Sequence, residues 1–144
     1  MRYWLMKSEP EAFSWQDLQK KGTAMWDGVR SYAARNHMRA MEVGDLGFFY
    51  HSNTGKEIVG ILRVTKAHYP DPTAEKGDWS VVEVAPVMAV NKPVSLATIR
   101  DEQATGGVLK DIKLIREGRL SVVPLTEPQW LYLLQIAQTN LPQS

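Results

Sequence analysis

Three long β-type segments in the middle of the chain constrain the fold more than any other feature of the sequence. The segments "DLGFFYHS" and "EIVGILRVTKAHY" are rich in branched and aromatic residues, and Asn53 and Gly55 between them suit a hairpin turn. The segment "WSVVEVAPVMAV" is a third of the same kind. Because apolar residues lie on both faces of the run "VGILRV", we expect a curled sheet that closes toward a small β-barrel.

Short helices are predicted at the periphery of this sheet. The helix "SWQDLQKKG" has Ser14 and Asp17 as a capping box and Gly22 as a stop signal. Further helices are predicted in "SYAARNHMRAM", "SLATIRDE" and "TEPQWLYLLQIAQ", and further strands in "RYWLM", "TAMW" and "LSVVPL". The helices do not alternate regularly with the strands, so the fold class is α+β. The alternative is a doubly wound parallel sheet.

The length of the chain predicts one domain, residues 1–144, because a chain of this size buries roughly two thirds of its unfolded surface in a single core. Lys and Arg number 17 and Asp and Glu 16, so the net charge is +1 and any polyanion site must be local. The sequence has no Cys, no run that resembles a signal peptide and no apolar run long enough for a membrane span. We therefore expect a cytoplasmic protein without a membrane partner.

Sequence motifs of enzymes, cofactor sites and metal sites are not found. The patterns GxSxG, GxxxxGK[ST], HExxH and GxGxxG after a strand are absent, and three His without Cys do not predict a zinc site. We therefore expect a binding protein rather than an enzyme, with no catalytic residue, no cofactor and no bound metal.

Residues 25–41 combine a Trp, an Asp-Gly turn and a predicted helix that carries positive charge and no acidic residue. At 100° per residue, one arc of this helix holds Tyr32, Arg35, Asn36 and Arg39. The opposite side holds Ala34, Met38 and Met41, which should pack on the core. The arc of polar residues should therefore face outward.

The arginines in this segment are candidate phosphate contacts. Arg30 precedes the helix, where backbone N–H groups and the helix dipole favour an anion. Because guanidinium groups suit phosphates, we expect Arg30, Arg35 and Arg39, beside Tyr32 and Asn36, to hold a nucleic-acid backbone. The alternative is that carboxylates from elsewhere in the chain pair with these arginines.

The five Trp residues fall into two groups. Trp4, Trp15 and Trp130 lie in apolar strand or helix patterns and are predicted to be core residues. Trp26 and Trp79 each lie at a junction between a loop and a strand, where burial explains a large ring less easily. If both rings lined one cavity, a base could stack between them, at ~1–3 kcal/mol per base.

Polar residues at two predicted strand ends could read the edge of such a base. The segment "MKSEP" supplies Lys7 and Ser8, and "YHSN" supplies Tyr50, His51 and Ser52. The alternatives are that His51 is a semi-buried structural histidine and that Ser8 caps a turn.

Seven motifs occur in the order found in the EVE domain family, which the chain resembles over residues 2 to about 137. These motifs are "YWLMKSEP", "WDGVR", "YAARN", "FFYHSN", "GDWSVVEV", "ATGG" with "LK", and "RLSVVPL". The resemblance implies a PUA-like β-barrel fold, similar to YTH and ASCH domains, and a nucleic-acid-binding module whose ligands are modified cytosines in DNA. It also implies that Trp26 is a wall of the base pocket, with Lys7 and Ser8 at its floor or rim.

Two alternative functions accompany this resemblance. One is an RNA-binding module of the PUA or YTH kind, which would favour single strands and contacts to the 2′-hydroxyl. The other is a small nucleoside amidohydrolase of the ASCH kind, for which Lys7, Glu9 and Lys56 are the candidate residues.

Overall fold

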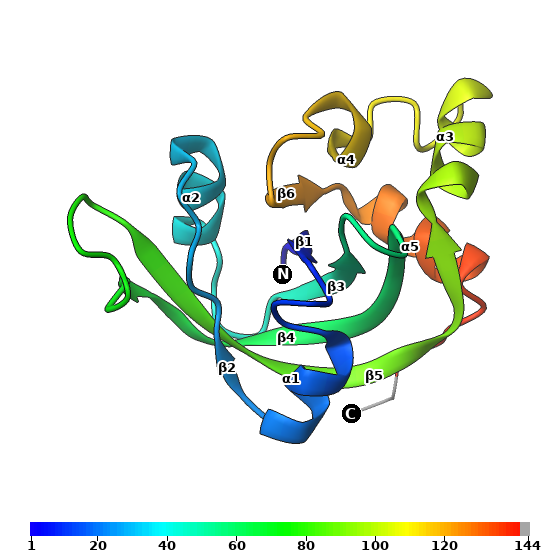
Figure 1. Cartoon of the computed structure of the whole chain (residues 1–144). Coiled ribbons are helices and arrows are strands. Elements are labelled where there is room, and N and C mark those ends of the chain that lie inside the picture. The colour runs from blue at the N-terminus through cyan, green and yellow to red at the C-terminus, as the bar shows by residue number, and fades with distance from the viewer. Residues whose placement is uncertain (142–144) are drawn as a thin grey trace.

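The computed structural model describes residues 1–141, which form one mixed six-stranded sheet with helices packed on both faces (Figure 1). The strands are β1 (Tyr3–Ser8), β2 (Ala24–Met25), β3 (Leu46–His51), β4 (Glu57–Pro70), β5 (Ser80–Ser95) and β6 (Val122–Leu125). The helices are α1 (Trp15–Lys21), α2 (Tyr32–Arg39), α3 (Leu96–Ala104), α4 (Lys113–Arg116) and α5 (Glu127–Ile136). No helix within the described residues is long and apolar enough to cross a bilayer. The fold class is α+β, as the sequence predicts.

The order of the strands in the sheet is β2-β5-β4-β3-β1-β6. β3, β4 and β5 are consecutive antiparallel neighbours, as the hairpin signals predict. β1 lies between β3 and β6 and runs parallel to β3, with Lys7 opposite Tyr50 and Ser8 opposite His51. The carboxyl ends of β1 and β3 therefore lie side by side.

Irregular pairing bends the long strands and gives the sheet its curl. The register of β4 against β5 shifts at several points between Ile58 and Tyr69, and the register of β3 against β4 shifts between Phe49 and Tyr50. Figure 1 shows β4 and β5 as long, curved ribbons. Within residues 1–141 the edge strands β2 and β6 do not pair with each other, so the curled sheet stays open.

Two elements differ from the sequence-based expectation. β5 continues to Ser95, beyond the segment that ends at Val90, and so leads directly into α3. α4 is a four-residue helix that the sequence patterns do not indicate. It has no side-chain cap, which is the signal by which the other helices are found.

The curled sheet buries residues on both faces, because successive side chains of a strand point to opposite sides. Phe48 belongs to the core under α3, α4 and α5, where it stacks on Trp130 with ring centroids 4.2 Å apart. Phe49 belongs to the core under α1 and α2, where its ring lies 5.6 Å from that of Trp15. Trp4, Trp15 and Trp130 are all buried, which confirms their predicted core roles.

Gly60 in β4 allows α1 to lie close against the sheet. A Cβ atom at residue 60 would lie 2.5 Å from atoms of the Trp15 ring, closer than two carbon atoms can approach. Trp15 is 2% exposed and is the first residue of α1, whose predicted capping box between Ser14 and Asp17 is formed. The missing side chain at residue 60 thus fixes the position of α1.

We expect Gly60→Ala to lower the free energy of unfolding by about 1–3 kcal/mol, because the added methyl group overpacks the contact with Trp15. Urea denaturation followed by circular dichroism measures this change. Gly107→Ala is the matched control, because a Cβ atom there would meet only the Thr105 hydroxyl, at 3.8 Å. We expect the control to stay within about 0.5 kcal/mol of the parent. Equal losses in the two variants would contradict the packing argument.

Candidate nucleic-acid interface

The paired ends of β1 and β3 bring most of the polar residues predicted for the base pocket to one place. The alternation of side chains then divides them between the two faces of the sheet. Lys7 and Tyr50 lie on the same face of the sheet as Leu5 and Phe48. Ser8 and His51 lie on the other face, with Phe49. Two hollows adjoin these strand ends, and Lys7 lines both of them.

The first hollow, called here the Trp26 hollow, has a volume of about 260 Å³. Its lining combines aromatic and apolar groups with a few polar ones, namely Lys7, Ser8, Ala12, Phe13, Lys21, Ala24, Met25, Trp26 and Asp27. Three residues that the resemblance assigns to the base pocket, Trp26, Lys7 and Ser8, therefore lie at one hollow. The lining therefore offers both an apolar surface and several hydrogen-bonding groups to a small molecule.

Trp26 is both a wall of this hollow and a part of the core. The residue is only 6% exposed, and its backbone N–H donates to the carbonyl of Val82 at 2.8 Å. Its ring lies edge-to-face with Phe49, at 5.5 Å between centroids, and with Phe13, at 6.4 Å. A bound base would therefore meet only the part of the indole that reaches the hollow.

The polar groups around the Trp26 hollow are partly engaged within the protein. The Ser8 hydroxyl donates to the carbonyl of Phe13 at 2.6 Å, and the Lys7 ammonium group donates to the carbonyl of Gly118 at 2.9 Å. Burial lowers the pKa of Lys7. Asp27 is exposed and adds a carboxylate that the sequence reasoning did not select, although its position next to Trp26 was the available signal.

The second hollow, called here the basic hollow, has a volume of about 450 Å³. It holds Tyr50 and Ser52, which were predicted for the same pocket as Trp26 and instead lie at this separate hollow. Burial raises the pKa of Tyr50, and the positive charge of Arg100 acts in the opposite direction. Sequence reasoning missed Arg100 and Arg119 at this hollow because they come from distant segments that carry no motif.

His51 lines neither hollow, so the structure does not bring it together with Trp26, Lys7 and Ser8. Its Nε2 atom accepts a hydrogen bond from the backbone N–H of Trp15 at 3.0 Å, and its ring lies edge-to-face with Phe49. Burial lowers the pKa of His51, while Glu57 and Glu11 act in the opposite direction. The imidazole therefore accepts an N–H at the start of α1, which is the structural alternative.

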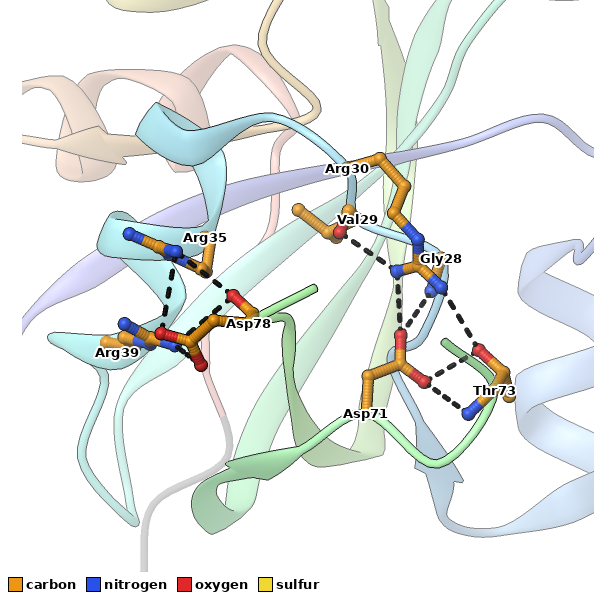
Figure 2. A network of polar contacts seen from close by, with 8 residues as sticks. All are labelled: Gly28, Val29, Arg30, Arg35, Arg39, Asp71, Thr73 and Asp78. Carbon is orange, nitrogen blue, oxygen red and sulfur yellow. Dashed lines mark hydrogen bonds and ion pairs between the residues drawn. The ribbon is translucent and has the colours of Figure 1, made fainter. Parts of the chain in front are cut away.

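The arginines near α2 are paired with carboxylates of the β4–β5 loop, residues 71–79 (Figure 2). Arg30 donates to Asp71 at 2.9 Å, and Asp71 also accepts from the N–H of Gly28 at 3.1 Å and from the N–H and hydroxyl of Thr73. Burial of Asp71 opposes ionisation, but these hydrogen bonds outweigh it and lower the pKa of Asp71 to about 2. Arg30 therefore has a strong internal partner.

Arg35 and Arg39 converge on Asp78 of the same loop (Figure 2). Arg39 donates to the Asp78 carboxylate at 2.8 Å and to the Ser80 hydroxyl at 2.9 Å. Arg35 lies 3.8 Å from the Asp78 carboxylate, and it donates to the carbonyl of Asp78 and to the side-chain oxygen of Asn36. The alternative of pairing with carboxylates from elsewhere thus holds for all three arginines.

Trp79 lies in this network and not at the Trp26 hollow. Its ring stacks on Tyr32 with centroids 5.0 Å apart, and the guanidinium groups of Arg30 and Arg35 lie 5.7 and 5.9 Å from its centroid. The two predicted pocket walls, Trp26 and Trp79, are therefore not brought together.

These contacts form what is called here the clasp, in which Arg30, Tyr32, Arg35 and Arg39 hold Asp71, Asp78 and Trp79. The opposite side of α2 is buried through Ala34 and Met38, with Met41 just beyond the helix, as predicted. Asp78 is 80% exposed, so its two ion pairs contribute little, about 0–1 kcal/mol each. Phosphate contacts from these arginines stay a prediction.

Comparison with known proteins places this geometry in a family. A sequence model of the EVE domain matches residues 2–136. Thymocyte nuclear protein 1 of Mus musculus is 40% identical over 168 residues, covering 96% of this chain and 74% of the mouse protein. A crystal structure of protein Atu2648 from Agrobacterium tumefaciens has a TM-score of 0.89 at 39% identity, covering 99% of this chain and 100% of that chain. Human THYN1, crystallised in complex with 5-methylcytosine-containing DNA, has a TM-score of 0.88 at 36% identity, covering 97% and 99%.

We expect Asp71→Asn to lower the free energy of unfolding at pH 7 by about 1–3 kcal/mol, because an amide cannot accept on both atoms and Arg30 loses its partner. The pKa of Asp71 in the folded protein lies below its ordinary value of 3.8, so the carboxylate stabilises the fold above about pH 4. That contribution is lost as the pH falls toward 2. Urea denaturation should therefore show the difference between parent and variant narrowing over this range.

The control for this experiment is Asp78→Asn, which removes an exposed carboxylate from the same loop. We expect its effect to be about 0.5 kcal/mol or less. A difference between parent and Asp71→Asn that stays constant from pH 7 to pH 2 would show that the ionised carboxylate of Asp71 does not stabilise the clasp.

Proposed function

The chain belongs to the EVE domain family, and on that premise we propose that it is a nucleic-acid-binding module that reads modified cytosine in DNA. The observation that carries the proposal is the Trp26 hollow in a fold shared with human THYN1, which was crystallised with 5-methylcytosine-containing DNA. Trp26, Lys7 and Ser8 meet at this hollow. The hollow is therefore the proposed site for the base.

The polar groups at the hollow complement the edge of a cytosine. Cytosine donates from its N4 amino group, and Asp or Glu is the side chain that accepts this bond. The exposed carboxylate of Asp27 can fill that role, while the ammonium groups of Lys7 and Lys21 can donate to the acceptor atoms of the ring. A substituent at C5 would meet the apolar part of the lining, formed by Phe13 and Met25.

The size of the hollow sets the form in which DNA is read. About 260 Å³ lies below the ~300–1,000 Å³ of sites that enclose drug-sized molecules, so the hollow suits one base. A base inside a duplex must therefore leave the stack, which takes a few kcal/mol. Contact with Trp26 and Phe13 offsets part of this, at ~1–3 kcal/mol for each stacked base.

Selectivity for a methyl group is expected to be modest. One buried methylene-sized group contributes only ~0.8 kcal/mol, which corresponds to about a fourfold difference in affinity. A larger polar substituent such as hydroxymethyl could add hydrogen bonds and be read more strongly.

We expect Ala12→Phe to weaken binding of a DNA duplex with one 5-methylcytosine by roughly 5- to 150-fold, because the added ring fills the hollow and excludes the base. Ala12 is exposed at the hollow, so the change leaves the core intact. Fluorescence anisotropy with a labelled duplex measures the affinity. Ala97→Phe, at an exposed residue of α3 that lines neither hollow, is the matched control. Unchanged affinity in a folded Ala12→Phe variant would place the base elsewhere.

We also expect Asp27→Ala to reduce the preference for cytosine over thymine at the target position by ~1–3 kcal/mol, because thymine lacks the N4 amino group. Competition between duplexes that differ only at that position measures the preference. Asp101→Ala removes an exposed carboxylate that lines neither hollow and should leave the preference unchanged. If both variants keep the parent's preference, Asp27 does not read the base.

RNA binding and nucleoside hydrolysis are the two alternative functions, and each can be tested separately. Recognition of RNA would be indicated by tighter binding of an RNA oligonucleotide than of its DNA counterpart. Hydrolysis of an amidated nucleoside is favoured by one observation: Lys7, Glu9 and Lys56 all line the basic hollow, and burial lowers the pKa of Lys7. We propose binding without catalysis, so an N4-acylated cytidine should be recovered unchanged after prolonged incubation. The cytoplasmic location also stays a prediction.

A further inference from the structure

The basic hollow gathers cations from four separate segments. Lys7 comes from β1, Lys56 from the turn between β3 and β4, Arg100 from α3 and Arg119 from the segment between α4 and β6. Glu9 is the carboxylate among the lining residues. Four cations therefore face one carboxylate, in a chain whose net charge is only +1.

These cations differ from those of the clasp in having no internal counter-charge. Among residues 1–141, no ion pair within 4.0 Å involves Lys7, Lys56, Arg100 or Arg119. Arg30, Arg35 and Arg39, in contrast, each lie within 4.0 Å of a carboxylate. The excess of positive charge is therefore larger at the basic hollow, with four cations and one carboxylate, than at the clasp, with three cations and two carboxylates.

The remaining lining indicates which kind of anion fits. Leu96, Leu114 and Ile115 provide an apolar part, and Ser52 and Asn53 provide neutral hydrogen-bonding groups. A phosphate ester matches this combination, because it carries several acceptor oxygens on one side and a sugar on the other. The volume of about 450 Å³ is also large enough for more than a single phosphate.

The basic hollow and the proposed base site share one lining side chain. Lys7 lines both hollows, and Ser8, the next residue, lines the Trp26 hollow. A nucleotide whose base enters the Trp26 hollow would therefore place its backbone beside Lys7.

We propose that the basic hollow binds the sugar-phosphate backbone next to the base held in the Trp26 hollow, with Lys56, Arg100 and Arg119 as the phosphate contacts. This inference rests on the proposed function of the Trp26 hollow. It places the principal phosphate contacts at the basic hollow and not on the face of α2 that carries Arg35 and Arg39.

The test compares the parent with the combined variant Lys56→Gln, Arg100→Gln and Arg119→Gln. Affinity for a duplex with one 5-methylcytosine is measured between about 0.05 and 0.2 M salt. Each phosphate contact that is lost should reduce the slope of log affinity against log salt by ~0.9. The loss of three contacts in the combined variant should therefore reduce this slope by about 2.7. The charge-matched control is Arg63→Gln, Lys66→Gln and Lys92→Gln, three exposed residues of β4 and β5 that line neither hollow. We expect the control to keep the parent's slope within about 0.5.

A second measurement tests the hollow without DNA. Cytidine 5′-monophosphate and pyrophosphate are titrated separately into the ¹⁵N-labelled parent and combined variant. We expect the nucleotide to shift the amide resonances of Ser52 and Asn53 in the parent and not in the variant. If pyrophosphate shifts these resonances and cytidine 5′-monophosphate does not, the hollow is a site for free phosphate and the backbone assignment is overturned.

The outcomes separate this inference from the proposed function. A combined variant that binds DNA with the parent's salt slope, while Ala12→Phe loses binding, overturns the phosphate assignment and leaves the base site intact. A parent that binds no DNA overturns the proposed function and the backbone assignment with it, whatever cytidine 5′-monophosphate does.

Discussion

The parallel hydrogen bonding between β1 and β3 is the constraint on which the functional geometry depends. It pairs Lys7 with Tyr50 and Ser8 with His51, and so brings together the carboxyl ends of two strands whose paired residues are 43 positions apart in the chain. Because side chains alternate, the paired ends supply polar groups to both faces of the sheet. One face leads to the Trp26 hollow and the other to the basic hollow, so a single pairing register produces two sites.

The distribution of charge follows from where the acidic residues of the chain lie. The β4–β5 loop carries Asp71 and Asp78 to the three arginines of the clasp, so two carboxylates offset most of the positive charge there. Within residues 1–141 no comparable acidic loop reaches the basic hollow, where Glu9 is the one carboxylate beside four cations. A chain with a net charge of only +1 can therefore still have a local concentration of positive charge. Such a local concentration is the form that a polyanion site must take in a chain of this composition.

Local signals in the sequence were sufficient for most of the elements, with α4 as the exception, but they could not reveal long-range pairing. The capping boxes at Ser14 and Thr126 are formed as predicted, because a cap depends on residues only three positions apart. The parallel placement of β1 and the ion pairs of Arg30 and Arg39 join residues about 40 positions apart, and no spacing rule reports them. For the same reason Trp26 and Trp79, which look alike as loop-strand aromatics, proved to lie in different environments.

Among the described residues, Lys7 is the one side chain through which binding at one hollow would affect the other. A single ammonium group contributes to both linings, and its bond to the carbonyl of Gly118 holds it in one place. A molecule that binds at one hollow and moves that ammonium group would change the affinity of the other hollow for its ligand. Thermodynamic reciprocity requires the second ligand to change the affinity for the first by the same factor. A ligand that displaces the Lys7 ammonium group from the Gly118 carbonyl would thus change the charge at both hollows by moving one side chain.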